Sequence, residues 1–432
     1  MELKSLKTVT QEVSGNFTRR NLLKGTGVAT LTGIAGLSTQ TSPAEAEGMR
    51  STIPTYKSIG LNTIINCMGT MTHLGGSIMP PDVVAAMTEA SRNFIPLREL
   101  QAAAGKRLSE LTGVEFGCIT PGCAAAMFAG TCACVAGGDR EKLTLIPLPN
   151  DVKGIKNECI VTKAHHTPFA RAISMVGVKI IEVDSKEEME KAFNDRTALV
   201  FIWGEISLPN HPAGGNVSLK DIIALAQKHS VPTLVDAAAE RPDVPNRYTE
   251  MGCDLVCYSG GKCLCGPNDS GLLLGRKDLV EMAVQSISPY GGMGRPMKIG
   301  KECIMGALAA LDLWINVRDH EAEWKEWERI LAYMSKVIEQ VPTVKTKVIP
   351  PGRLANYTPS MFVTWDQNKV KLTPNELMQK LAEGAPRVYV DRRKGDEFRS
   401  RGEWVSICPF VMQSGEEIPA AQKFYEVMSN AM

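Results

Sequence analysis

Two patterns of hydrophobic residues alternate along residues 64–275. Apolar runs of five or six residues predict buried strands, and stretches with apolar residues at i, i+3 and i+4 predict amphipathic helices. Strands that alternate with helices are typical of a parallel α/β sheet. The predicted strands are 115–119, 158–162, 178–183, 198–203, 231–236, 254–258 and 270–275, and a further strand from residue 64 enters a loop that ends at residue 76. The predicted helices are 81–91, 97–113, a small-residue helix that ends at residue 136, 187–193 and 219–229.

The pattern changes after residue 300. Residues 302–341 predict one long amphipathic helix, and the short segments behind it predict a small α+β domain. We therefore expect an N-terminal arm at 47–65, a large α/β domain at 66–300, and an interdomain helix with a small domain at 301–432. The short segments are the strands 344–348, 360–364, 387–390 and 404–407 and the helices 374–383 and 419–429.

The N-terminal segment differs from the rest of the chain. Arg19 and Arg20 precede a mildly apolar run at 25–37, and residues 44–46 form an Ala-x-Ala pattern. Paired arginines before such a run are typical of a twin-arginine export signal. We therefore expect residues 1–46 to be a signal peptide for the twin-arginine export machinery and the mature chain to be periplasmic or exported. A disordered basic tail is the alternative.

Composition and charge exclude some classes of function. The 432 residues carry a formal net charge of +1, and 44% are hydrophobic and 22% charged. This is the composition of an ordinary globular protein, and the charge balance disfavours a nucleic-acid partner. No apolar run after residue 46 is long enough to span a bilayer, so we expect no stable membrane anchor after signal removal.

The twelve cysteines all lie beyond the predicted signal. They include no C-x-x-C pair, and the two C-x-C pairs at 132/134 and 263/265 lack a matching zinc or cluster pattern. We therefore expect buried small hydrophobic residues rather than disulfide partners, and no metal site.

The strongest candidate for chemistry is residues 253–279, CDLVCYSGGKCLCGPNDSGLLLGRKDL. An apolar strand ends in a Ser-Gly-Gly turn that presents Lys262, and a second apolar strand follows. Burial lowers the pKa of a lysine amine and makes its neutral form available to attack an aldehyde. Ser259, three residues earlier, is placed to hydrogen-bond a phosphate beside the lysine.

Asp236 ends the apolar strand at 231–236. Parallel α/β sheets bind their ligands at this end of the strands. The carboxylate can pair with a protonated ring nitrogen. The alternative is that Asp236 caps a helix beginning at residues 237–239.

Residues 120–126, TPGCAAA, connect a predicted strand to a small-residue helix. We expect Thr120 to cap this helix and Pro121 to occupy its first position. The N–H groups around Gly122 and Cys123 would then face an anion such as phosphate. An ordinary capped core helix is the alternative.

His165 and His166 lie three and four residues after the end of the strand at 158–162. A histidine just past a strand end can stack on a flat heteroaromatic ring, although a structural role is the alternative for each. The pattern does not decide between the two. Together with Lys262 and Asp236, these elements match what pyridoxal phosphate needs: an amine, an acid for the ring nitrogen, N–H groups for the phosphate and a flat side chain.

The chain from about residue 59 onward resembles fold-type I pyridoxal-phosphate enzymes. It is most similar to the branch that contains L-seryl-tRNA selenium transferase (selenocysteine synthase) and the D-glucosaminate-6-phosphate ammonia-lyase-like family. The motifs that carry the resemblance are IINCMGTMTHLGG, ITPGCAAAMFAG, PTLVDAAAE, DLVCYSGGKCLCGPNDSGLLLGRKDL and GRPMKIGKE. The resemblance implies a mostly parallel seven-stranded sheet flanked by helices, with a small C-terminal α+β domain.

The resemblance also implies roles for single residues. Lys262 would be the Schiff-base lysine, Asp236 would face the ring nitrogen, and His165 would stack on the ring. Gly122, Cys123 and Ser259 would surround the phosphate of pyridoxal 5'-phosphate.

The expected substrate-binding residues come from three segments of the chain. The resemblance implies that Arg295 and Lys298 face an anionic substrate group. Thr72 lies in the glycine-rich loop before residue 76. Arg387, or in its place Arg392 or Arg393, offers a fork for a carboxylate, and a surface arginine is the alternative for each of the three. The family further implies a homodimer or higher homo-oligomer with sites at the subunit interface.

Two departures separate this chain from the family pattern. The relatives are cytosolic, whereas this chain has a predicted export signal, and it lacks the basic N-terminal module that a selenium transferase uses for tRNA. The substrate therefore does not carry over.

The implied reaction is a lyase reaction on an amino acid or amino sugar acid. Lys262 would remove the α-proton, a β-substituent would leave, and ammonia would be released. The alternatives are an aminotransferase or other transferase and a non-catalytic binding protein that keeps the fold. A Ser-x-x-Lys acyl-transfer enzyme is disfavoured because the sequence lacks its S-D-N and K-T-G companions.

Overall fold

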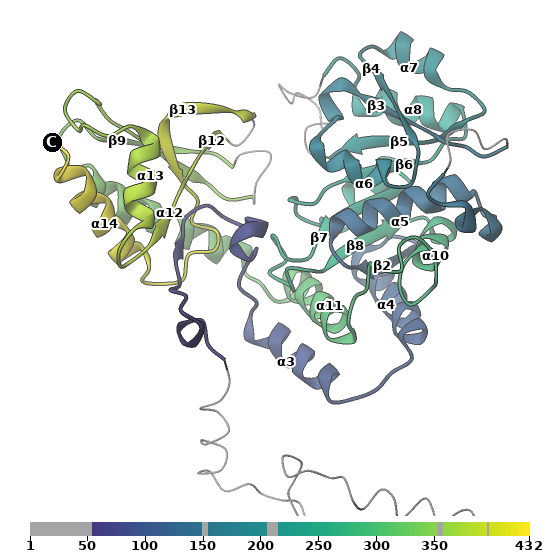
Figure 1. Cartoon of the computed structure of the whole chain (residues 1–432), viewed down its shortest axis with the longest axis horizontal. Helices are drawn as coiled ribbons and strands as arrows, with labels where there is room; N and C mark the ends of the chain where they lie inside the picture. Colours follow the sequence, from purple (N-terminus) through teal and green to yellow (C-terminus); the bar gives the residue numbers. More distant parts are fainter. Residues whose placement is uncertain (1–53, 149–153, 205–214, 352–356, 395–396) are drawn as a thin grey trace, which may run out of the picture. The chain divides into compact units, whose positions relative to one another are not determined.

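The computed structural model describes residues 54–148, 154–204, 215–351, 357–394 and 397–432 (Figure 1). The chain divides into two compact units, residues 1–63 and 64–432. The described part of the first unit contains a short 3-10 helix, Lys57–Ile59. The predicted export signal at 1–46 lies outside the described residues.

The second unit contains a seven-stranded sheet. Its strands lie in the order β2 (Phe116–Thr120), β8 (Gly271–Gly275), β7 (Leu255–Ser259), β6 (Thr233–Asp236), β5 (Thr197–Trp203), β3 (Glu158–Thr162) and β4 (Lys179–Val183). Within this sheet β8 runs antiparallel to β2 and β7, and the other neighbours pair in parallel. The prediction of a mostly parallel seven-stranded sheet, and with it the fold class, is confirmed.

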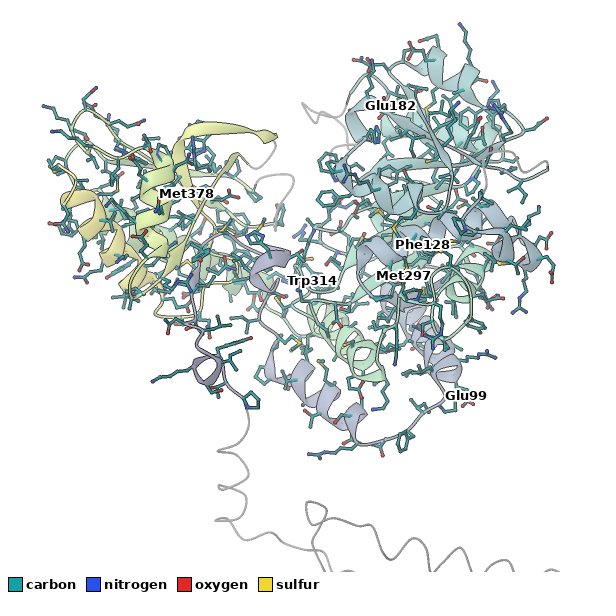
Figure 2. All side chains as sticks on the ribbon, viewed as in Figure 1. Glu99, Phe128, Glu182, Met297, Trp314 and Met378 are labelled. Atoms are coloured by element: carbon teal, nitrogen blue, oxygen red, sulfur yellow. The ribbon has the colours of Figure 1, made fainter. Side chains whose placement is uncertain are left out.

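Helices cover both faces of this sheet because successive residues on each strand point to opposite sides. Leu234 of β6 packs in the same core as Phe128, which Figure 2 labels on its helix. The next residue, Val235, packs in the other core with Ile222. The first core is lined by α5 (Cys123–Ala136), α6 (Arg171–Ser174) and α10 (Lys277–Ser286), and the second by α4 (Leu97–Thr112), α7 (Lys186–Ala192), α8 (Leu219–Lys228) and α11 (Lys301–Asn316).

Two further helices belong to this part of the chain. The helix α3 (Pro81–Ser91) packs against α11, with Val83 fully buried, and its bounds are those predicted from the sequence. The short helix α9 (Arg247–Glu250) precedes β7 and begins at Asn246, whose side chain caps it. The helix α10 was not predicted.

The long helix predicted at 302–341 is wrong, because two helices replace it. The first is α11, and α12 (His320–Ile338) follows after a break at residues 317–319. Asp319 Oδ1 accepts the N–H groups of Glu321 and Ala322 at 3.1 and 3.0 Å. An aspartate that satisfies the free N–H groups of a helix start makes a new helix favourable at this point.

The C-terminal part forms a separate antiparallel sheet in the predicted α+β pattern. Its strands lie in the order β12 (Asp391–Lys394), β13 (Glu397–Ile407), β10 (Ser360–Thr364) and β9 (Lys345–Ile349). The helices α12, α13 (Pro374–Ala382) and α14 (Glu417–Ser429) contribute Met334, Leu377 and Phe424 to its core. The strand β12 was not predicted.

The strand predicted at 387–390 does not join this sheet. It is β11 (Val388–Tyr389), which pairs in parallel with β1 (Ile65–Asn66), more than 300 residues earlier in the chain. Ile65 and Val388 lie in the same core as the C-terminal helices. No helix in the part of the chain that the structure describes combines the length and apolar character needed to cross a bilayer.

Candidate active site

Asp236 is the last residue of β6, and only 4% of it is exposed. The N–H of Ala238 donates to Oδ1 at 3.0 Å, and the thiol of Cys123 donates to the same oxygen at 3.6 Å. Residues 237–240 form a turn rather than a helix, so the alternative of a helix cap does not apply. The sheet thus presents one buried carboxylate at the end where parallel strands bind ligands.

Opposing effects act on the protonation of Asp236. Burial raises the pKa of this carboxyl, whereas the ammonium of Lys262 and the hydrogen bonds from Ala238 and Cys123 work in the opposite direction. Burial is the largest of these effects, so the pKa lies above its ordinary value. A positively charged ligand group beside the carboxylate would therefore stabilise the ionised form.

Lys262 lies half-buried in the turn after β7, the strand next to β6. Its charge acts on both Asp236 and Cys123, which places the amine within electrostatic reach of the buried carboxylate. The cofactor interpretation requires these two groups to serve opposite ends of one small molecule. The structure brings them to adjacent strand ends, as that interpretation expects.

Contacts from distant segments hold the lysine turn. Ser77 Oγ, just after the glycine-rich loop, donates to the carbonyl of Gly261 at 3.0 Å. Arg318 Nη1 donates to the carbonyl of Cys263 at 2.9 Å. The two carbonyls flank Lys262 in the chain. The turn is therefore fixed from two sides.

The N-terminus of α5 faces open space. Gly122 precedes this 14-residue helix with φ +84°, a conformation that favours glycine, and a Cβ added there would meet nothing within 4 Å. No side chain caps the helix. The first N–H groups, at Cys123 and beyond, can therefore bind an anion.

The predicted cap of this helix is wrong. The helix begins at Cys123 with Gly122 in the cap position, so neither Thr120 nor Pro121 takes the place expected for it. Thr120 Oγ1 donates instead to the carbonyl of Gly122 at 2.9 Å. Because the hydroxyl stabilises the turn, the helix N–H groups stay available, which favours the phosphate interpretation over an ordinary capped helix.

The two histidines after β3 point in different directions. His165 is fully buried at 0% exposure. His166 is exposed, and its Nδ1 pairs with Oε1 of Glu182 on β4, which Figure 2 labels. His165 is thus the one of the two that lies inside the protein, and its role in stacking on the ring stays a prediction.

The residues around Asp236 fit pyridoxal phosphate. The site combines a buried carboxylate, a lysine within its electrostatic reach, an uncapped helix start with space before it, and Ser259 at the end of β7. Pyridoxal phosphate requires such groups for its amine-reactive aldehyde, its ring nitrogen and its phosphate. By contrast, no set of three His, Cys, Asp or Glu residues in the described ranges is arranged to hold a metal ion.

All twelve cysteines are free thiols, and ten of them are buried. This agrees with their prediction as small hydrophobic residues. Cys123 and Cys257 differ from the others because they lie beside Asp236: Cys123 by its hydrogen bond, and Cys257 because it pairs with Asp236 in the sheet register. Only the fold reveals this grouping, since 113 residues separate Cys123 from Asp236.

The predicted substrate residues have other contacts. Arg295 is exposed and donates to Ser288 Oγ at 3.1 Å, and Lys298 and Thr72 are exposed. Arg387 donates to the Tyr389 hydroxyl at 2.7 Å. The described contacts of these residues do not involve Lys262, so their roles in substrate binding stay predictions.

Arg318 was missed in the sequence analysis. Besides its bond to the lysine turn, its Nε donates to Glu323 at 2.7 Å, and its guanidinium carbon lies 4.7 Å from the ring centroid of Trp314, which Figure 2 labels. The signal that could have found it is Asp319 followed by Glu321, which marks a helix start inside the predicted long helix.

Comparisons with known proteins identify relatives of this chain. The profile of the family "Aminotransferase class-V" matches residues 156–349. The 5'-C-glycyluridine monooxygenase-decarboxylase of Streptomyces sp is 30% identical over 347 residues, which cover 78% of this chain and 83% of the relative. The D-glucosaminate-6-phosphate ammonia lyase of Salmonella typhimurium (strain 14028s / SGSC 2262) is 33% identical over 267 residues, 60% of this chain and 69% of the relative.

A solved structure agrees as well. The structure of D-glucosaminate-6-phosphate ammonia-lyase superimposes with a TM-score of 0.73 at 25% identity and covers 88% of this chain and 99% of that chain. The predicted resemblance to fold-type I pyridoxal-phosphate enzymes, and to the ammonia-lyase-like branch, is confirmed.

Proposed function

Because the chain belongs to the aminotransferase class-V family of pyridoxal-phosphate enzymes, we propose that it is a lyase that releases ammonia from an amino acid or amino sugar acid. The observation that carries the proposal is the buried Asp236 carboxylate within electrostatic reach of Lys262, at adjacent strand ends. The similarity to an ammonia lyase in both sequence and fold supports the reaction class.

Each residue of the site would contact a different part of the cofactor. Lys262 would hold the aldehyde, Asp236 the ring nitrogen and His165 the ring face, while Ser259 and the N–H groups at the start of α5 would hold the phosphate. When bound, pyridoxal phosphate supplies an electron sink for the charge that develops at the α-carbon of the substrate.

The chain's own proton chemistry centres on Lys262. We assign its Nζ as the base that takes the substrate α-proton once the substrate amine has replaced it on the cofactor, since its charge acts on the buried Asp236 carboxyl. A β-hydroxyl then leaves as water, and one water is taken up when the amine leaves as ammonia. The balanced products are a 2-keto acid and ammonia.

Cofactor attachment and turnover test this proposal. Purified protein should be yellow, and borohydride followed by peptide mass spectrometry should place the cofactor on Lys262. A panel of β-hydroxy and sugar-derived amino acids should yield ammonia and 2-keto acid in equal amounts, and Lys262→Ala should lose both colour and turnover. Colourless wild-type protein that ignores added pyridoxal phosphate would point to a binding protein, and turnover retained by Lys262→Ala would refute the assigned role.

A second candidate reaction is an oxidative decarboxylation. It is favoured by the similarity to a monooxygenase-decarboxylase over 83% of that relative. The two reactions can be told apart by gas exchange, because oxidative decarboxylation consumes O2 and releases CO2. An oxygen electrode run on the same substrate panel separates them: elimination leaves dissolved O2 unchanged.

We also propose that residues 1–46 direct export through the twin-arginine machinery. The motif around Arg19 and Arg20 supports this proposal. A reporter fused behind residue 46 should reach the periplasm in a normal strain and stay in the cytoplasm when both arginines are changed to lysine. Export that survives the double change would refute it.

We further propose that the enzyme acts as a homo-oligomer. Exposed apolar side chains support this: Phe94 is fully exposed, and Val84 and Ile95 are each 45% exposed. Light scattering of wild-type protein should give at least a dimer, and Phe94→Asp should shift it toward the monomer. A wild-type monomer at micromolar concentration would refute this.

A further inference from the structure

Cys123 occupies an unusual place for a buried cysteine. It is the first residue of α5, yet its side chain turns toward the sheet, where its sulfur lies 3.6 Å from Oδ1 of Asp236. The residue is 8% exposed. Its side chain thus contacts the carboxylate, while its backbone N–H belongs to the open helix start.

The chemistry of Cys123 makes it a donor. A hydrogen bond with Cys257, burial and the nearby carboxylate all raise its pKa well above the ordinary value. Its sulfur therefore keeps its proton at neutral pH and can donate it to an acceptor. Cys257 pairs with Asp236 in the sheet register, so it supports Cys123 from the neighbouring strand.

The two hydrogen bonds to Asp236 fall on one oxygen. Ala238 N–H and the Cys123 thiol both donate to Oδ1, and within the described ranges no donor reaches Oδ2. Donors on a single oxygen fix the rotation of the carboxylate about its terminal bond. The second oxygen then remains available for a ligand.

We propose that Cys123 is a positioning residue for Asp236, whose thiol holds Oδ1 so that Oδ2 can accept the ring N–H of the cofactor. This inference rests on the proposed function, because it assumes that pyridoxal phosphate is the ligand. Cys123 would thus have two roles. Its backbone N–H would bind the phosphate of the cofactor, and its sulfur would act through Asp236 on the ring nitrogen.

A cofactor analogue tests this division. Apoprotein would be titrated with pyridoxal phosphate and with 1-deazapyridoxal phosphate, which has carbon in place of the ring nitrogen. Cys123→Ala should weaken binding of pyridoxal phosphate about five- to tenfold, the effect of one hydrogen bond of about 1 kcal/mol. The same change should alter binding of the deaza analogue less than about twofold, because that analogue offers no ring N–H.

Two variants control the experiment. Cys123→Ser keeps a donor and should recover most of the lost affinity for pyridoxal phosphate. Cys134→Ala removes a thiol from the same helix, buried at 3% exposure but far along the helix from its start, and should match wild type with both ligands. Thermal melts of the apoproteins would show which variants stay folded.

The possible failures are distinguishable. An equal loss of affinity for both ligands in Cys123→Ala would assign the side chain to packing or to the phosphate and overturn the inference. An unchanged affinity for pyridoxal phosphate would overturn it too. Wild-type protein that binds neither ligand would instead refute the proposed function, and the inference would fall with it.

Discussion

Gly271→Ala should displace the start of α5 and weaken cofactor binding. A Cβ at position 271 would lie 2.3 Å from the carbonyl carbon of Gly122 and 2.5 Å from the backbone nitrogen of Cys123. Ordinary contacts begin at 3.4 Å, so the methyl group is about 1 Å too close. Both neighbours are backbone atoms, which cannot rotate out of the way as a side chain can.

The strand cannot easily yield to this methyl group. Gly271 is paired with Thr120 on β2 and with Ser259 on β7, so it is held on both sides. The displacement must then fall on the helix start. Overpacking of this kind lowers the free energy of unfolding by about 1–3 kcal/mol. A shift of about 1 Å would also stretch the 3.6 Å contact of Cys123 with Asp236 beyond hydrogen-bonding distance.

Two measurements check this prediction. Urea unfolding of the apoprotein should show the loss of stability, and fluorescence titration should show pyridoxal phosphate binding at least tenfold more weakly, which corresponds to ~1.4 kcal/mol. Gly130→Ala, in the same helix α5, is the matched control. The atoms nearest its added Cβ belong to the side chains of Leu234 and Leu255, at 3.1 Å or more. Unchanged stability and affinity in Gly271→Ala would refute the reasoning.

Three further predictions follow from the site. Burial raises the pKa of Asp236 above its ordinary 3.8, so the folded apoprotein loses stability as the pH rises through the raised pKa. Asp236→Asn should therefore stabilise the apoprotein more at pH 7 than at pH 4. Urea unfolding at both pH values measures this gain, and an equal gain at the two would contradict the prediction. His165→Ala should destabilise the protein by about 1–3 kcal/mol and weaken cofactor binding, because His165 is buried. His166 is exposed, so His166→Ala should stay within about 0.5 kcal/mol of wild type. Equal effects of the two changes in thermal melts and cofactor titrations would contradict the prediction. Arg318→Ala should lower the free energy of unfolding by about 2–3 kcal/mol, because the carbonyl of Cys263 beside the lysine loses its charged donor. Borohydride should then fix the cofactor on Lys262 more slowly. Fixation at the wild-type rate would show that the turn does not need Arg318.

Local patterns predicted many elements well. The bounds of α3, β3 and β10 agree with those predicted from the sequence, and the others inside the seven-stranded sheet differ by one or two residues. Such patterns work where a segment's apolar period and its turn residues agree. The break between α11 and α12 escaped because the apolar period continues across it, while the capping contact of Asp319 decides the boundary.

The position of residues within the site could be predicted only in part. The strand-end location of Asp236 follows from the end of an apolar run, and the turn of Lys262 follows from its glycines. The pattern could not choose between His165 and His166, because adjacent residues after a strand can turn to either side. Burial in the structure distinguishes them, with His165 inside and His166 at the surface.

The sequence alone predicted most of the strands and helices along the chain and the residue types that suit an aldehyde, a ring nitrogen and a phosphate. These properties depend on neighbours along the chain: apolar period, strand length and turn composition. Tertiary structure decided which groups meet. Cys123 donates to Asp236 across 113 residues, and Ser77 reaches the lysine turn across 184. Contacts over such separations depend on how the strands are ordered and packed, which no local pattern encodes.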